Sequence, residues 1–212
     1  MREALEPEYE IVFFHATGVS DRSLVTLASQ GFFTAIVDLV PGTFSEWLLG
    51  GNRPSGKDRL DVARDIPIPY VLCPGGFDLI SCGPMERKTK SDPLWVGRGL
   101  AERKLYSQDD LRVQARMSPE ESAQVAIAVA ARLNEYTCKG RVKVVIPEKG
   151  FTSLSVETGP LHDPIADQAF ITALESHLSE DIEVTKVDTD INSRGFADIV
   201  VKVLADAQRA CR

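Results

Sequence analysis

Five short apolar runs separated by helical patterns are the feature that most constrains the fold of this chain. The runs lie at residues 10–14, 35–39, 69–73, 142–146 and 182–187. Continuous apolar runs are typical of strands covered on both faces, and strands that alternate with helices are typical of a parallel sheet. We therefore predict an α/β fold, a three-layer Rossmann-like domain whose mostly parallel sheet has about five or six strands, with all five runs as neighbours.

Helix signals lie between the runs, and one long segment interrupts the alternation. Ser118 to Glu121 form a capping box with proline at the first helical position, and Asp163 before a proline is a second helix start. Residues 84–112 are rich in charges and follow no clean period. We predict a single domain over residues 1–212, in which 84–112 is a lid or a long surface loop.

The acidic balance of the chain limits its partners. Asp and Glu number 31 against 24 Lys and Arg, so the formal net charge is -7. This charge disfavours nucleic acid and membrane surfaces as partners, because their phosphates would be repelled, but it leaves room for a small anion held by backbone N–H groups. No apolar stretch reaches the length of a membrane span, no signal peptide is visible, and the four cysteines form no CxxC pair and no zinc spacing. We expect a cytoplasmic protein with reduced thiols and no metal site.

The carboxyl ends of the predicted strands are where a ligand is expected, because a parallel sheet gathers them at one edge. Residues 10–31 read as a strand, a tight turn and a helix, and the free N–H groups at such a helix start suit an anion. Gly18 permits the turn and Ser20 can cap the helix. The residues predicted to bind the ligand follow these strand ends: Thr17, Gly18, Ser20, Asp38, Gly50, Gly51, Gly75, Gly76, Asp78, Gly150 and Asn192.

His15 is the candidate for an acid or base, since it ends the first apolar run just before the turn. A histidine in this place more often ties down the turn by bonding a backbone carbonyl. Asp38 and Asp78 suit a ribose or a metal, or bond loop backbone instead. The chain has no Walker loop, G-x-G-x-x-G, G-x-S-x-G or H-E-x-x-H motif, which removes the commonest enzyme classes.

Short motifs along most of the chain occur in the order found in one known family. They are His15-Ala-Thr-Gly18, Gly50-Gly51, Asp58-Arg59-Leu60, Gly75-x-x-Asp78, Pro119-Glu-Glu121, Pro147-x-x-Gly150, Gly159-Pro160 with Asp163-Pro164, and Ile191-Asn192 with Phe196-Ala-Asp198. The chain resembles the uncharacterised family that includes the tomato mosaic virus resistance protein, often labelled an ATP-binding domain family. It matches the second half of that family's unit. The resemblance implies ATP with Mg as cofactor and an N-terminal α/β subdomain as partner.

The chain departs from the family pattern at several polar positions. Val19-Ser20-Asp21 replaces a glycine-rich turn, and Thr43 stands where relatives tend to have glutamate. Gln108-Asp109 stands where they tend to have His-Asn, and Asp190 where they tend to have histidine. These changes favour a weakened or repurposed site, so we expect no nucleotide hydrolysis by this chain alone.

The leading hypothesis is a binding module for a nucleotide or another phosphorylated small molecule, acting beside the N-terminal subdomain. A second hypothesis is a hydrolase or transferase that uses His15 as acid or base. A third is a protein-interaction or oligomerisation domain without catalysis, for example a homodimer.

Overall fold

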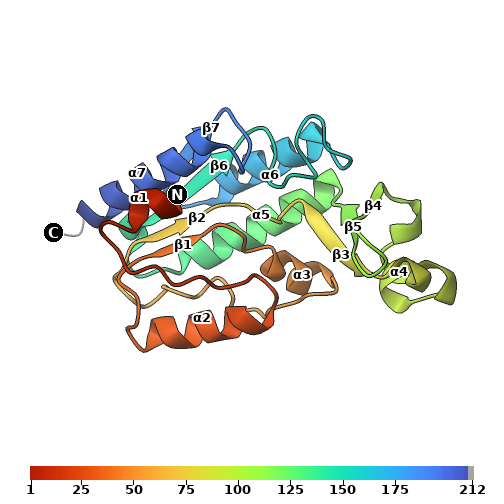
Figure 1. Cartoon of the computed structure of the whole chain (residues 1–212), viewed down its shortest axis with the longest axis horizontal. Helices are drawn as coiled ribbons and strands as arrows, with labels where there is room; N and C mark the ends of the chain where they lie inside the picture. The colour runs from red at the N-terminus through yellow and green to blue at the C-terminus, as the bar shows by residue number, and fades with distance from the viewer. Residues whose placement is uncertain (210–212) are drawn as a thin grey trace.

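Four of the five predicted runs form one parallel sheet. The computed structural model describes residues 1–209, except for the side chains of residues 89 and 90. The strands are β1 (Ile36–Asp38), β2 (Tyr70–Leu72), β6 (Val142–Pro147) and β7 (Glu183–Val187), in the order β1-β2-β6-β7 (Figure 1). In this register Val37 lies opposite Val71, Val71 opposite Lys143, and Val145 opposite Thr185. The predicted parallel sheet is confirmed for these four runs.

Helices cover both faces of the parallel sheet. Tyr70 and Leu72 of β2 point into one core, whereas Val71 between them packs into the other, as the two-residue period of a strand requires. The larger core is completed by α2 (Val19–Ser29), α3 (Thr43–Leu49), α5 (Pro119–Asn134) and α6 (Pro164–His177). The smaller core lies under α7 (Arg194–Arg209), against which the short α1 (Arg2–Leu5) packs.

Both predicted helix starts are confirmed. At the start of α5 the Ser118 hydroxyl accepts from the Glu121 N–H (3.2 Å), and the Glu121 carboxylate accepts from the Ser118 N–H (3.0 Å). At the start of α6 the Asp163 carboxylate accepts from the N–H groups of Ile165 and Ala166, both at 3.1 Å. At the start of each of these two helices, two backbone N–H groups that lack a partner within the helix are thereby hydrogen-bonded.

The first apolar run, residues 10–14, is not a strand, and this part of the prediction is wrong. Val12 is 58% exposed and Phe13 is 70% exposed, so the run is not covered on both faces. Side-chain contacts hold this part of the chain in place. The Tyr9 hydroxyl donates to the Gln208 side chain of α7, and the Phe14 ring packs edge-on against Phe33 with ring centroids 5.7 Å apart. An apolar run favours a strand only where a neighbour supplies a hydrogen-bond ladder, and here the parallel sheet ends at β1.

A second, antiparallel sheet lies beside the parallel one and was not predicted. It has the order β3-β5-β4 and contains β3 (Leu79–Gly83), β5 (Val113–Arg116) and β4 (Leu105–Ser107). Between β3 and β4 the chain forms η1 (Met85–Lys90), α4 (Pro93–Gly97) and η2 (Leu100–Glu102). This unit projects at the right-hand end of Figure 1. Segment 84–112 therefore contains ordered elements, and the buried indole of Trp95 anchors it by donating to the Cys82 carbonyl (3.0 Å).

Free thiols are found at Cys73, Cys82 and Cys138, and Cys211 lies outside the described residues. The remaining short helix, η3 (Lys139–Arg141), leads directly into β6.

Candidate functional site

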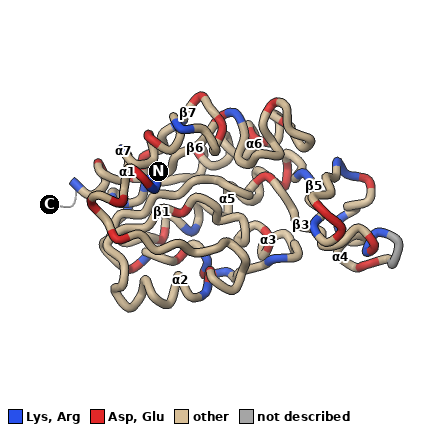
Figure 2. The backbone as a smooth tube through the Cα atoms, viewed as in Figure 1, with Lys and Arg blue, Asp and Glu red and all other residues tan. Residues whose placement is uncertain are grey.

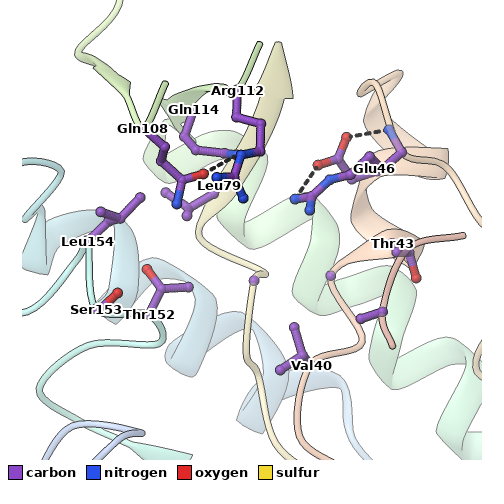
Figure 3. A pocket seen from close by; sticks show the side chains of 14 residues that line it. Val40, Thr43, Glu46, Leu79, Gln108, Arg112, Gln114, Thr152, Ser153 and Leu154 are labelled. Atoms are coloured by element: carbon purple, nitrogen blue, oxygen red, sulfur yellow. Dashed lines mark hydrogen bonds and ion pairs between the residues drawn. The ribbon is translucent and has the colours of Figure 1, made fainter. Parts of the chain in front are cut away.

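A cavity of about 290 Å³ lies between the parallel-sheet part of the molecule and the antiparallel sheet. The turns after β1 and β2, the start of α3 and the loop after β6 form one side of it, and the antiparallel sheet forms the other (Figure 3). Its lining residues are Ala16, Val40, Gly42, Thr43, Glu46, Arg53, Gly76, Leu79, Gln108, Arg112, Gln114, Thr152, Ser153 and Leu154. The cavity therefore lies at the carboxyl edge of the parallel strands, where the sequence predicts a ligand.

Glycines allow the turns after β1 and β2 to pack backbone against backbone beside the cavity. A Cβ on Gly42 would lie 2.8 Å from the Gly76 carbonyl oxygen, and one on Gly75 would lie 2.2 Å from that of Leu39. Gly76 also has a φ of 80°, which side chains resist. Gly75 and Gly76 were predicted for this place, whereas Gly42 was missed.

Glu46 is a buried carboxylate in the cavity wall. It lies on α3 and is 3% exposed. One carboxylate oxygen accepts from the Ser81 N–H (2.9 Å) and the other from the Arg53 N–H (3.2 Å), and the Arg53 guanidinium lies 3.8 Å away (Figure 3). Burial raises the pKa of Glu46 above its ordinary value, although these donors and Arg53 oppose the shift. Gly51 packs directly on this carboxylate, since a Cβ there would lie 1.8 Å from it.

The antiparallel sheet and its β4–β5 turn contribute amide and guanidinium groups to the cavity. Figure 3 shows Gln108, Arg112 and Gln114 gathered on one side, across from Val40 and Thr152. The Gln114 side-chain nitrogen donates to the Gln108 oxygen (3.2 Å), which leaves the Gln108 nitrogen available to a ligand. The Arg112 guanidinium pairs with exposed Asp109, and 65% of its side chain stays exposed.

Thr43 and Gln108, two of the positions at which the chain departs from the family pattern, line this cavity. The hydroxyl oxygen of Thr43 is buried without a hydrogen-bond partner among the described residues. In Figure 3 this oxygen points away from the other labelled side chains.

Asp78 lies behind the cavity wall and reaches it through Thr152. The Thr152 hydroxyl donates to the Asp78 carboxylate (2.8 Å), and an Arg116 nitrogen lies 3.5 Å from the same oxygen. Arg116 also donates to Asp167 at 2.5 Å, so it ties the antiparallel sheet to α6. Burial raises the pKa of Asp78, and it raises the pKa of Asp167 to about 6.

Asp38 and the start of α2 belong to a buried ion cluster outside the cavity lining. Arg59 donates to both Asp38 oxygens (2.6 and 2.8 Å), and the Tyr70 hydroxyl donates to Asp38 at 2.9 Å. Arg59 also pairs with Asp21, whose carboxylate accepts from the Gly18 N–H (2.7 Å). The chain therefore places its own carboxylate where an anion was predicted.

The other predicted site residues also lie outside the cavity lining. His15, Thr17 and Asn192 are exposed. Ser20 is not the helix cap, because Gly18 occupies that position and α2 begins at Val19. Gly50 and Gly150 have positive φ angles, which glycine adopts without strain. Gly50 ends α3 (φ 80°), and buried Gly150 (φ 127°) packs on Val156.

Charge on the molecule is mixed rather than concentrated. Figure 2 shows acidic and basic residues interspersed along the backbone. Within residues 1–209, no group of three His, Cys, Asp or Glu side chains is placed to hold a metal ion. The helices described for this chain include none with the length and apolar character to cross a membrane.

Comparison with known sequences identifies relatives along nearly the whole chain. A UPF0261 protein of Rhizobium meliloti (strain 1021) is 29% identical over 206 residues, which are 96% of this chain and 49% of the relative. A UPF0261 protein of Clostridium tetani is 26% identical over 197 residues, 92% of this chain and 46% of the relative. The ToMV resistance protein Tm-1(GCR237) of Solanum lycopersicum is 28% identical over 204 residues, 95% of this chain and 26% of that protein.

The chain spans about half the length of the bacterial relatives that it matches. Residues 1–207 match the family described as "Uncharacterised protein family (UPF0261) C-terminal domain". The order of the short motifs predicted this relationship, and the chain therefore belongs to the UPF0261 family as its C-terminal domain.

Proposed function

We propose that this chain is a small-molecule binding module and that its cavity binds a phosphorylated ligand. The observation that carries the proposal is the pair of guanidinium groups, Arg53 and Arg112, in a cavity at the carboxyl edge of the parallel strands. Guanidinium groups match the geometry of phosphate oxygens and remain charged at any physiological pH. The backbones at Gly42 and Gly76 pack against each other and form the wall of the cavity at this edge.

The proposal moves the anion from the start of α2 to this cavity. Asp21 already accepts from the Gly18 N–H, and its charge would repel a phosphate there. In the cavity the buried carboxylate of Glu46 accepts from two backbone N–H groups and lies 3.8 Å from the Arg53 guanidinium. The cationic groups of the lining are Arg53 and the largely exposed Arg112, which pairs with Asp109. We infer that the sheet with its helices is a Rossmann-like, three-layer arrangement, in which ligands bind at this edge.

The N-terminal half found in longer relatives is part of the proposal as a partner. The chain covers 49% of the Rhizobium meliloti protein, and it carries exposed apolar side chains at Val12 and Phe13. Exposed apolar groups of this kind favour contact with another protein surface. We infer that the two halves act together on the ligand.

Isothermal titration calorimetry tests the cavity directly. Inorganic phosphate, phosphorylated sugars and ATP with Mg would be titrated into the wild type, Arg112→Gln and Arg209→Gln. Arg209 is a matched control, because each arginine pairs with an aspartate three residues earlier and their side chains are 65% and 70% exposed.

We expect Arg112→Gln to weaken binding about tenfold, which corresponds to about 1.4 kcal/mol, and Arg209→Gln to leave it unchanged. Absence of binding by every phosphate compound, or equal effects of the two substitutions, would overturn the proposal.

A further inference from the structure

We propose that the cavity is selective for a phosphorylated sugar or polyol over a nucleotide. This inference rests on the proposed function, because it specifies the ligand of the same cavity. It follows from the kinds of side chain that line the cavity, from its volume and from the hydrogen-bonding groups left free in it.

The described lining offers no aromatic surface on which a nucleobase could stack. Among the described residues of the cavity none is aromatic, and the large apolar side chains are Val40, Leu79 and Leu154. A base is a flat apolar group, and proteins usually hold it against aromatic rings or arginine planes. The two arginines of the lining, Arg112 paired with Asp109 and Arg53 bonded to Ser81 (2.9 Å), have no aromatic lining residue opposite them to enclose a base.

The volume also favours a small ligand. The cavity measures about 290 Å³, and sites for drug-sized molecules span roughly 300–1,000 Å³. A sugar phosphate is much smaller than a nucleotide, which carries the same kind of group and a base in addition. A cavity at the small end of this range suits the smaller of the two ligands.

The free polar groups of the cavity match hydroxyl groups. Thr152 donates its proton to Asp78, so its oxygen can accept from a ligand hydroxyl. The Gln108 nitrogen can donate to one, and the exposed Ser153 hydroxyl can do either. Figure 3 shows Thr152 and Ser153 together on one wall and Arg112 on another. A ligand with hydroxyls at one end and a phosphate at the other uses both walls.

Calorimetric titration of four probes tests the inference: ribose 5-phosphate, AMP, ribose and inorganic phosphate. Ribose 5-phosphate and AMP differ by the adenine base, and ribose and phosphate separate the two halves of the smaller ligand. We expect ribose 5-phosphate to bind about tenfold more tightly than AMP and than phosphate, and ribose alone to bind most weakly.

Two substitutions locate the hydroxyl contacts. Gln108 and Ser153 are exposed, so Gln108→Ala and Ser153→Ala should leave the fold intact, which circular dichroism would check. We expect each substitution to weaken the binding of ribose 5-phosphate by about three- to tenfold and to leave the binding of inorganic phosphate unchanged. Arg112→Gln should weaken the binding of ribose 5-phosphate and of inorganic phosphate alike.

The outcomes separate this inference from the proposed function. Tighter binding of AMP than of ribose 5-phosphate would overturn the sugar specificity and retain a phosphate site. Equal losses for phosphate and ribose 5-phosphate in Gln108→Ala and Ser153→Ala would also overturn it. Failure of all four probes to bind would overturn both.

Discussion

Replacing Arg59 by methionine should unfold the protein at a much lower temperature than wild type. Arg59 neutralises two buried carboxylates, Asp21 on α2 and Asp38 at the end of β1. Burial alone would lower the pKa of Arg59, but Asp38 and Asp21 raise it above its ordinary value, so the guanidinium stays charged. Methionine keeps most of the apolar length and leaves both carboxylates without their cation.

The expected loss follows from the burial of the pair. Removing one partner of a buried ion pair costs about 3–5 kcal/mol, because the remaining charge has no counter-ion. For a domain of this length 1 kcal/mol corresponds to roughly 2–4 °C, so the melting temperature should fall by about 6–20 °C. Urea unfolding followed by circular dichroism would give the free energy of unfolding directly.

Arg64→Met is the matched control. Arg64 also contacts several carboxylates, Asp61, Asp65 and Glu135, but its side chain is 35% exposed. Exposed ion pairs contribute about 0–1 kcal/mol each, so this substitution should cost far less than Arg59→Met. Adding Asp38→Asn to Arg59→Met should restore part of the stability by removing an orphaned charge. Similar losses in Arg59→Met and Arg64→Met, with no recovery in the double variant, would refute the reasoning.

Four further outcomes are expected. Thr43→Val should raise the free energy of unfolding by about 1 kcal/mol in urea titrations, since it removes a buried hydroxyl without a partner and keeps the methyl group; a loss of stability would contradict this. The pKa of Asp167 is raised to about 6 in the folded state, so its contribution to stability is present below about pH 4 and is lost as the pH rises through 6. The free energy of unfolding of Asp167→Asn, measured in urea, should therefore rise by roughly 1–3 kcal/mol relative to that of wild type as the pH goes from 4 to 8. A difference that does not change with pH would count against the raised pKa. Phe13→Ser should change stability by less than about 0.5 kcal/mol, because the ring is 70% exposed; a large loss of melting temperature would mean that the run is buried. Phosphate release from ATP or GTP with Mg should stay at background, because water must be oriented beside the phosphate and His15 is exposed outside the cavity lining; turnover that disappears in His15→Ala would overturn this expectation.

Much of the candidate site could not be read from local pattern. Of the residues predicted to bind ligand, Gly76 lines the cavity, while Gly75, Gly51 and Asp78 support its walls from behind. Glu46 was missed, although an acidic residue within the apolar sequence of α3 is a signal that could have found it. Gln108 was singled out only as a departure from the family pattern, and Arg112 carried no signal, because both lie in an exposed, charged segment.

Local sequence determined the elements whose stabilising contacts are local. The Ser118 capping box and the Asp163 cap bond residues two or three positions away, so their patterns predicted both helix starts. Apolar runs predicted β1, β2, β6 and β7, and the central strands β2 and β6 are buried because helices cover the sheet on both faces, whereas β7 at the edge is only partly buried. The order of motifs along the chain predicted the family.

Only the tertiary structure decided which apolar run joins the sheet and which polar groups meet. Phe13 and Val71 lie in similar apolar runs, yet one is exposed and the other buried, because strand pairing depends on a distant neighbour. The antiparallel sheet brings Gln114 and Arg112 to a cavity whose other walls hold Glu46 and Thr152. Arg116 fixes that sheet to α6 through Asp167, 51 residues away. Such contacts depend on how the chain closes long loops, and local sequence periodicity contains no record of that closure.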